Sequence, residues 1–435
     1  MAEHYGTLGV VRSLGRAGIR VYAVDPNATA PAFASRYCMG AYVRDIETAP
    51  LAASLEMLCG ISDELGGRPL LIPTTDETAL FVAEHAEMLA QWFEFSDQNA
   101  GLVKALCNKR EMYHLAQLSG VPVPMTFSPK TREEVNEIAD KATFPLALKA
   151  SGGGTLGERA NKRIILVHDK DSLLRQYDAM HGPFCRSVMV QEYIPGPEEA
   201  SWMFNGYFDR DSQCLVSFTG KKLRQNPIYS GMTSLGECCA NEGVAETSRN
   251  FLKRLNYQGI VDIDYRYDYR DGRYKILDVN PRVGASFRLF VDRKGIDVVR
   301  AMYLDLTGQP VPKSTLWEGR KWIVEDKDVR STLLYFRDGT LSVRKWWKSV
   351  HGIGEAGYFL IGDQRPFWRM CWNHCRRKLG PLFGALGWRR SQKSIREKRS
   401  GSARTTMTGY RSEVASPRAT DNVTRTFEED HGNFR

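Results

Sequence analysis

The segment Lys275–Ser286, KILDVNPRVGAS, places Asp278, Asn280 and Arg282 on alternate residues directly after an apolar run. In an extended strand successive side chains point to opposite faces, so these three project from one face, while Leu277 and the valine after Asp278 point to the other. Two oxygen ligands followed by a fixed cation suit a site that holds Mg²⁺ on a phosphate group. An edge strand with a solvated face gives the same alternation, so other segments must decide between the two interpretations.

The composition is that of a soluble globular protein with two or three domains. The chain has 435 residues, of which 42% are hydrophobic, and this length exceeds the usual size of one core. No apolar run approaches the roughly 18 residues of a membrane span. The nine cysteines include no C-x-x-C pair, which favours a reducing cytoplasm over a disulfide framework or a zinc site.

The positive charge is concentrated near the C-terminus. Between Gln364 and Arg411 there are thirteen Lys or Arg against the single acid Glu397, so this segment has a net charge of +12. The whole chain has a net charge of +9, and the remainder therefore carries −3. The basicity therefore belongs to a tail and does not indicate a nucleic-acid-binding protein.

The first hundred residues alternate strand-like and helical patterns. Ile19–Asp25 and Pro69–Thr78 are predicted to lie in a doubly wound parallel sheet, the second leading into a helix, with Asp25 and the Thr74–Glu77 cluster at the sheet's ligand-binding edge. The first helix, GTLGVVRSLGRAG, has no strand before it. Either the sheet lacks its first strand or the true start codon lies upstream.

A second unit begins near Leu106 and carries a candidate phosphate site. Lys149 ends an apolar strand and is followed by a glycine-rich turn containing Ser151, Gly152, Gly153 and Gly154. Glycines let backbone N–H groups approach a polyphosphate, and the lysine adds a point charge. A glycine-rich surface turn is the alternative.

Four later segments alternate as antiparallel strands do: SWMFNGYFD, CLVSFTGKKLRQ, GIVDIDYRYD and RYKILDVN. A hairpin through the Tyr269–Arg273 turn would bring Asp264 within reach of a cation shared with Asp278 and Asn280.

Taken in order, these pieces resemble the ATP-grasp superfamily, most closely its carboxylate–amine ligase branch, which includes the D-aspartate ligases and relatives of carbamoyl-phosphate synthetase. The resemblance covers roughly Gly6–Gly308. It implies an α/β chain with the ATP-grasp fold behind an N-terminal doubly wound pre-ATP-grasp domain. The expected boundaries are 1–105 for that domain, 106–310 for the ATP-grasp domain (subdomains 106–186 and 187–310), 311–362 for a small appended element, 363–411 for a basic amphipathic tail and 412–435 for a disordered end.

The resemblance also implies roles for individual residues. Lys109 and Lys149 would bind phosphates, the loop from Ser151 to Gly154 would close over them, and Arg282 would steady the transferred phosphoryl group. The adenine hinge would be Gln191, Glu192 and Ile194, with Glu198 on the ribose, and the Mg²⁺ ligands would be Asp264, Asp278 and Asn280. Many relatives have Glu in place of Gln191, and several have Glu in place of Asp278.

The implied chemistry uses ATP with two Mg²⁺ ions, or Mn²⁺, to convert a carboxylate into an acyl phosphate that an amine attacks. The substrates would be an amino acid or an envelope or exopolysaccharide precursor. Arg224, in the basic loop GKKLRQNPIYSG, is predicted to hold the substrate carboxylate in bidentate fashion, unless the loop is a solvated hairpin end. Phe287–Phe290 are expected to help select the substrate. A bicarbonate-dependent carboxylase and a non-catalytic ATP-binding scaffold are the alternatives, although retention of both lysines, the three metal ligands and Arg282 argues against a scaffold.

The tail from Pro366 is predicted to be a helix ending at Gly380, with Trp368, Trp372, Cys375 and Leu379 in one apolar stripe flanked by basic residues. Such a helix suits peripheral contact of 366–399 with an anionic membrane. Docking on the catalytic domain is the alternative. We expect small-molecule partners and no nucleic acid, with a dimer left open.

Overall fold

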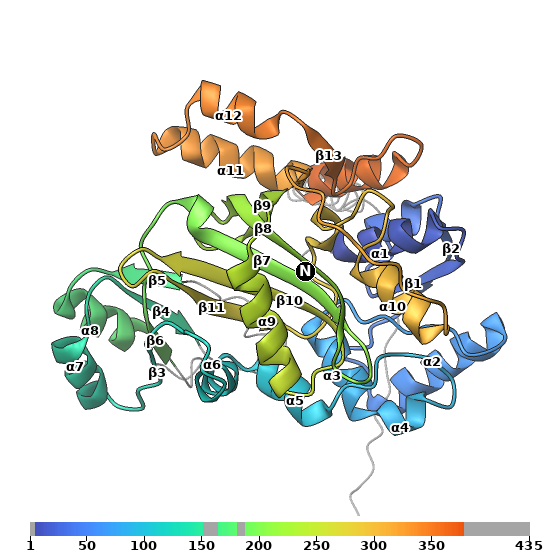
Figure 1. Cartoon of the computed structure of the whole chain (residues 1–435), viewed down its shortest axis with the longest axis horizontal. Helices are drawn as coiled ribbons and strands as arrows, with labels where there is room; N and C mark the ends of the chain where they lie inside the picture. The colour runs from blue at the N-terminus through green and yellow to red at the C-terminus, as the bar shows by residue number, and fades with distance from the viewer. Residues whose placement is uncertain (1–4, 151–163, 181–187, 378–435) are drawn as a thin grey trace, which may run out of the picture. The chain divides into compact units, whose positions relative to one another are not determined.

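The computed structural model describes residues 5–150, 164–180 and 188–377 (Figure 1), and residues 1–374 form one compact unit. Its centre is a seven-stranded sheet in the order β11-β10-β7-β8-β9-β12-β13. The strands are β7 (Ser201–Phe208), β8 (Cys214–Asn226), β9 (Met232–Cys238), β10 (Gly259–Asp268), β11 (Arg273–Asn280), β12 (Lys321–Ile323) and β13 (Ile353–Ala356). The α/β fold class is confirmed.

The N-terminal part contains less sheet than its sequence predicts. β1 (Val21–Asp25) and β2 (Cys38–Val43) pair in parallel, but the strand predicted within Pro69–Thr78 makes only an isolated bridge from Leu70 to Glu94. Thr75 and Thr78 instead form a capping box that starts a helix. The helices here are α1 (Tyr5–Gly15), α2 (Leu51–Leu65), α3 (Asp76–Glu84), α4 (Ala86–Leu89) and α5 (Ala100–Cys107).

A second, four-stranded antiparallel sheet lies in the part predicted as the first ATP-grasp subdomain. Its order is β3-β6-β4-β5, with helices α7 and α8 packed together against it. The elements are α6 (Lys109–Leu118), β3 (Thr126–Phe127), α7 (Arg132–Lys141), β4 (Leu146–Ala150), β5 (Ile164–Val167), α8 (Lys170–Met180) and β6 (Val188–Glu192).

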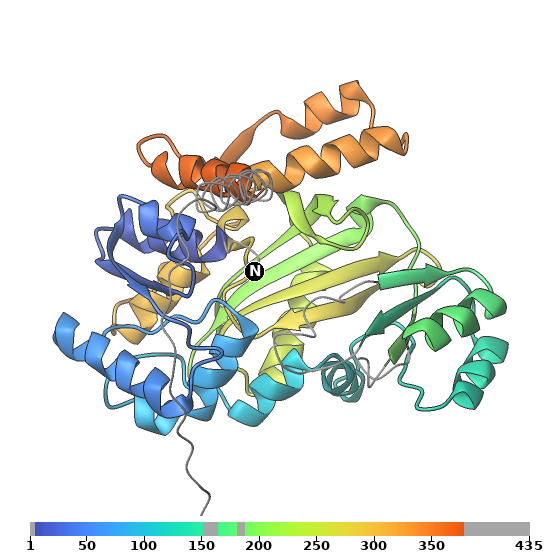
Figure 2. The ribbon, with the colours of Figure 1, turned by 180° about the vertical axis from the view of Figure 1, so that it is seen from behind.

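Helices cover both faces of the large sheet. On one side α6 and α9 (Glu242–Arg254) share a core with β7, β10 and β11, and on the other α1 and α10 (Val298–Leu306) pack over β7, β8 and the segment after β11. Figures 1 and 2 show these two layers from opposite sides. Residues Phe287, Leu289 and Phe290 are fully buried in the second core, so these side chains stabilise the fold and do not face a substrate.

A bulge re-aims the side chains of the decisive segment. Tyr265 pairs with Ile276, but Asp264 pairs with Asp278, so Leu277 is the extra residue in β11. Ile276 and Val279 therefore both enter the core although they are three residues apart. The predicted hairpin is confirmed, but Ile276, and not Leu277, joins the valine on the buried side.

The part after α10 is built onto the large sheet. β12 pairs with β9 and β13 with β12, and α11 (Glu325–Arg337) packs on β8 and β9, followed by α12 (Val343–Val350). The chain then returns to α1, where the Arg12 guanidinium donates 2.9 Å bonds to the side chain and backbone of Asp363. Asp363 also accepts from Ser35 and from the backbone N–H of Arg36.

We expect Asp363→Ala to destabilise the protein by about 3–5 kcal/mol, because it leaves the buried Arg12 charge without its carboxylate partner. The matched control is Asp178→Ala, which removes the half-exposed ion pair with Arg132 and should cost less than about 1 kcal/mol. Urea unfolding midpoints measure both. Equal shifts for the two variants would contradict this assignment.

Candidate active site

Lysines from two other elements hold the acidic side chains of the β10–β11 hairpin. Lys109, at the start of α6, donates to the Asp278 carboxylate, and Lys222 on β8 donates to Asp264 Oδ2 at 2.7 Å. Burial alone would raise the pKa of Asp278, but the Lys109 charge outweighs it and the pKa falls below its usual range. Asp264, Asp278 and Asn280 therefore line one face of the hairpin, which we call the acidic wall. Each of its two carboxylates is balanced by an ammonium group.

A third carboxylate on this face was missed by the sequence analysis. Asp262 lies two residues before Asp264 and pairs with Asn280 across the hairpin. Burial, and then the charge of Asp264, raise the pKa of Asp262 to about 7. The V-D-I-D alternation was the signal that could have revealed it. Lys222 was likewise visible in the basic segment, two residues before Arg224.

Arg282 connects this wall to the N-terminal part. Its guanidinium donates to Asp76 Oδ1 at 2.8 Å and to Asn280 Oδ1 at 3.0 Å. Asp76 begins α3, in the Thr74–Glu77 cluster that the sequence placed at a ligand-binding edge. A small cavity of about 30 Å³, lined by residues that include Ile72, Pro73 and Arg282, lies at this junction.

Lys149 joins the site from the four-stranded sheet. It donates to Gln191 Oε1 at 2.6 Å, and Gln191 in turn donates to Thr126 Oγ1 at 2.8 Å. Burial, followed by the charge of Lys109, lowers the pKa of Lys149 to about 8. The two predicted phosphate lysines are thus electrostatic neighbours, although they come from different elements.

The predicted hinge residues lie at the end of β6 and just after it, next to the β10–β11 hairpin. The Glu192 carboxylate accepts from Arg270 at 2.6 Å and from the backbone N–H of Met125 at 3.1 Å. The backbone carbonyl of Ile194 is bonded by Arg266 at 2.7 Å. These bonds connect β6 and the residues after it to the β10–β11 hairpin.

Glu198 contacts β8, and Arg224 is a residue of that strand. Glu198 accepts from Gln225. Arg224 forms a buried bidentate pair with Asp328 of α11, with N–O distances of 2.8 and 2.7 Å. The basic segment is part strand and part hairpin end: it runs along β8 to Asn226 and then forms the largely exposed turn before β9. Arg224 lies in the strand, and it reaches a substrate carboxylate only if Asp328 moves. Ser151, Gly152, Gly153 and Gly154 lie outside the described residues.

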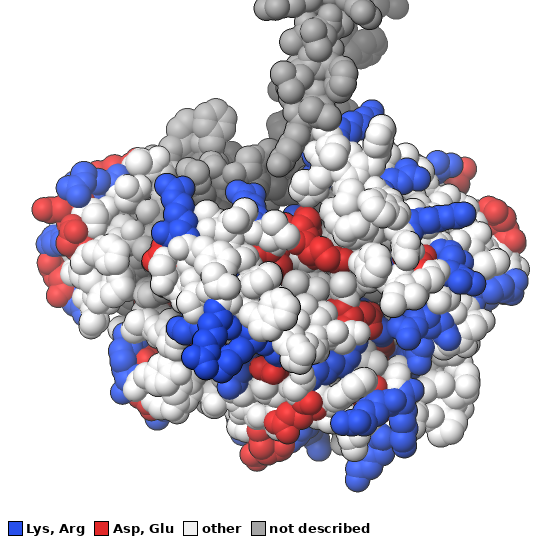
Figure 3. All heavy atoms as spheres, turned by 90° about the horizontal axis from the view of Figure 1, so that it is seen from above, with Lys and Arg blue, Asp and Glu red and all other residues white. Residues whose placement is uncertain are grey.

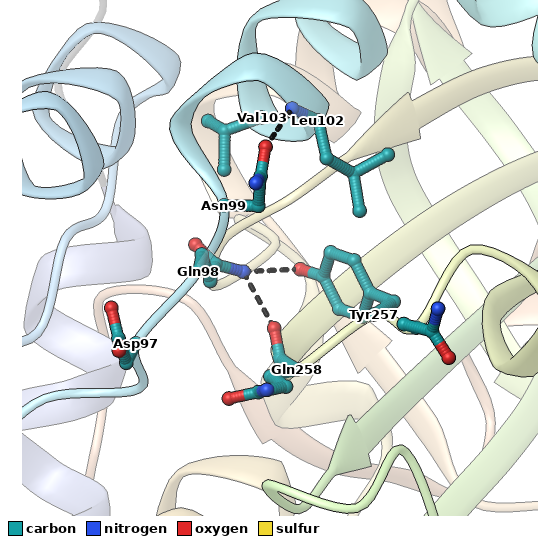
Figure 4. A pocket seen from close by; sticks show the side chains of 8 residues that line it. Asp97, Gln98, Asn99, Leu102, Val103, Tyr257 and Gln258 are labelled. Carbon is teal, nitrogen blue, oxygen red and sulfur yellow. Dashed lines mark hydrogen bonds between the residues drawn. The ribbon is translucent and has the colours of Figure 1, made fainter.

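A separate polar pocket of about 260 Å³ contains none of the predicted site residues. It is lined by Asp97, Gln98, Asn99, α5 and the loop before β10 (Figure 4). Gln98 bridges Tyr257 Oη at 2.7 Å and the Gln258 carbonyl at 2.8 Å. These bonds fix the linker between the N-terminal part and the large sheet.

Comparisons with known proteins find relatives in sequence and in fold. The chain is 27% identical over 246 residues to D-aspartate ligase of Enterococcus faecium (strain Aus0004), a match that covers 53% of this chain and only 57% of that protein. Its fold is similar to that of Staphylococcus aureus N5-carboxyaminoimidazole synthetase complexed with ADP (TM-score 0.57, 12% identity, 74% of this chain and 79% of the other). It is also similar to the biotin carboxylase domain of Hydrogenobacter thermophilus 2-oxoglutarate carboxylase, bound to MgADP and bicarbonate (TM-score 0.56, 17% identity, 74% and 72%). No protein-family model matches the chain.

In sequence over about half of its length, and in fold, the chain is similar to enzymes of the ATP-grasp superfamily. The resemblance predicted from its sequence, including that to the carboxylate–amine ligases, is confirmed. Within the ATP-grasp fold, the seven-stranded sheet supplies the acidic wall, and the four-stranded sheet supplies Lys149 and Gln191.

We expect nucleotide affinity to fall as pH rises through about 8, because Lys149 then loses the charge that attracts phosphate. Nucleotide binding should take up a fraction of a proton near this pH, since phosphate stabilises the charged form. Calorimetry of ADP binding in buffers of different ionisation enthalpy measures the uptake. Lys149→Arg is the control, because its guanidinium stays charged. Identical pH profiles for Lys149→Arg and the unaltered protein would contradict the role of Lys149.

Proposed function

We propose that the chain is an ATP-dependent ligase that joins a carboxylate to an amine through an acyl phosphate. The observation that supports this most is the convergence of Lys109, Lys149 and Arg282 on the carboxylate wall of β10 and β11. Cations beside a row of oxygen ligands suit the triphosphate of ATP and its metal ions. The similarity to a D-aspartate ligase supports the same chemistry.

The wall's donor set fits Mg²⁺, a hard cation that prefers oxygen ligands. Asp264, Asp278 and Asn280 would hold it, and the metal would neutralise charge on the phosphates. Among the described residues no three His, Cys, Asp or Glu side chains converge as a ready-made metal site. Lys109 and Lys222 sit on two of the carboxylates, so we expect both ammonium groups to turn away when metal and nucleotide enter.

Two steps follow for the reactants. The substrate carboxylate attacks the γ-phosphorus of ATP, which breaks the bond to ADP and forms an acyl phosphate. The amine then attacks the acyl carbon, releasing phosphate and a proton, and an amide bond forms. Lys109, Lys149 and Arg282 stabilise the negative charge that moves during phosphoryl transfer, while Gln191, Glu192, Ile194 and Glu198 position the nucleoside.

The N-terminal part is proposed to bind the carboxylate substrate. Arg282 already holds a carboxylate, that of Asp76, at the junction with α3. An amino acid or an envelope precursor is the substrate class we propose. Arg224 is reassigned within this proposal from direct substrate contact to positioning β8 through Asp328.

The direct test of this function is ADP release by the full-length protein with pairs of carboxylates and amines, including D- and L-amino acids. Release that needs both an acid and an amine, with an amide product detected by mass spectrometry, is the expected result. Release that needs bicarbonate instead would favour the carboxylase alternative, which the fold similarity to a bicarbonate-bound domain keeps open. Nucleotide binding without turnover on any pair would favour a scaffold.

Replacing wall residues should stop turnover and leave the fold intact. We expect Asp278→Ala and Asn280→Ala each to lower Mg²⁺-dependent ADP release at least about a hundredfold, because one metal ligand contributes several kcal/mol of charge stabilisation. Glu246→Ala, on the exposed side of α9, is the matched control and should retain activity. Normal ADP release by either wall variant would remove the metal assignment.

A further inference from the structure

The appended part of the chain exposes an unusual set of apolar side chains. Seven of them, all between residues 329 and 372, expose 62–85% of their surface: Val329, Leu333, Val343, Trp347, Ile361, Trp368 and Trp372. Elsewhere in the described residues only Met39, Leu118 and Tyr269 among the large hydrophobic side chains are as exposed. Single exposed apolar residues are ordinary, but a concentration of this kind marks an interaction surface.

These side chains point away from the sheet. α11 buries Asp328, Ser331, Thr332 and Tyr335 against β8 and β9. Val329 and Leu333 lie one helical turn apart on its other side. In α12, Val343 and Trp347 again lie one turn apart. No residue of this helix is buried.

The helix at 365–374 behaves in the same way. It docks through Phe367, Met370 and Cys371 on the core under α1, and Asn373 donates to the Thr29 carbonyl at 2.9 Å. Trp368 and Trp372 stay on the outer side. The sequence had placed them in an apolar stripe, and the alternative that the helix docks on the rest of the protein is correct, but it docks by its other face.

The charge on this surface is almost entirely positive. In 325–374 seven Lys or Arg residues are exposed: Arg330, Arg337, Arg344, Lys345, Lys348, Arg365 and Arg369. Of the six acids in the same range only Asp338 is exposed, because the other carboxylates point inward to partners such as Arg12, Arg224 and Arg288. Figures 1 and 2 show α11 and α12 together on one side of the large sheet, and Figure 3 looks onto that side, where groups of Lys and Arg are visible with some Asp and Glu among them.

We infer that the outer face of α11, α12 and residues 361–374 docks on the surface of an anionic phospholipid bilayer. Tryptophan and aliphatic side chains enter the interface between headgroups and acyl chains, while surrounding Lys and Arg bind the headgroups. No described helix is long and apolar enough to cross a membrane, so the helices would lie on the surface. This inference goes beyond the proposed ligase activity and does not depend on it.

Two other occupants fit less well. A nucleic acid gains nothing from Val329, Leu333, Val343 and Ile361, since bases stack on aromatic rings and phosphates need cations. A protein interface is normally poor in lysine at its centre, whereas α12 has Lys345 and Lys348 on either side of its two adjacent tryptophans. Residues 375–399 add nine further Lys or Arg against one acid in the sequence, which extends the match to an anionic surface.

The test is co-sedimentation of the full chain with vesicles of equal parts phosphatidylglycerol and phosphatidylcholine, and with phosphatidylcholine alone. We expect binding to the anionic vesicles that weakens at high salt. Trp347→Ser with Trp368→Ser should reduce the bound fraction at least about tenfold, and Lys345→Gln with Lys348→Gln about fivefold per charge at low salt. A melting temperature within error of the unaltered protein shows that each variant is folded.

The matched control carries Leu118→Ser and Arg210→Gln, which remove an equally exposed apolar side chain and an exposed charge from the catalytic part. It should bind vesicles as the unaltered chain does. The inference would be overturned if all the variants bound vesicles equally or if the chain did not bind vesicles. Tighter binding to single-stranded RNA, or a dimer that the Trp347 and Trp368 substitutions dissociate, would overturn it as well. Failure of the ligase assay would leave it standing.

Discussion

Three carboxylates on one face of a single hairpin must be balanced by cations, and this constraint organises the molecule. Asp262, Asp264 and Asp278 share the same side of β10 and β11, where burial makes their mutual repulsion costly. Their counter-charges come from separate places: Lys109 from α6 and Lys222 from β8. These ion pairs therefore also fix α6 and β8 against the hairpin that carries the proposed metal and phosphate site.

Ion pairs across long sequence distances join the N-terminal part to the rest of this compact unit. Arg282 reaches Asp76 in the N-terminal part, and Arg12 in α1 reaches Asp363 near the end of the described chain. The N-terminal part is consequently fixed between the acidic wall and the appended element. Its helix α3 begins beside Arg282, a position that suits the carboxylate selection proposed for the N-terminal part.

Much of this could be predicted from the sequence because local alternation dictates it. The D-x-N-x-R segment and the hairpin before it fixed the facing of Asp278, Asn280 and Asp264. The sequence marked the segments that contain Lys222 and Asp76, but it could not predict which side chains they contact, because tertiary packing brings them to Asp264 and Arg282. Arg224 was misjudged for the same reason, since its partner Asp328 lies 104 residues away. The strand expected before Thr75 is reduced to a single bridge between Leu70 and Glu94.

We propose that Lys109 and Lys222 pair with the wall carboxylates only until metal and nucleotide bind there. The most direct measurement is a crystal structure of the protein with MnADP, using anomalous scattering to locate the metal. The account predicts manganese among Asp264, Asp278 and Asn280, with the Lys109 and Lys222 ammonium groups moved off the carboxylates toward the phosphates. Manganese bound elsewhere, or nucleotide bound with both lysine–aspartate pairs intact, would contradict it.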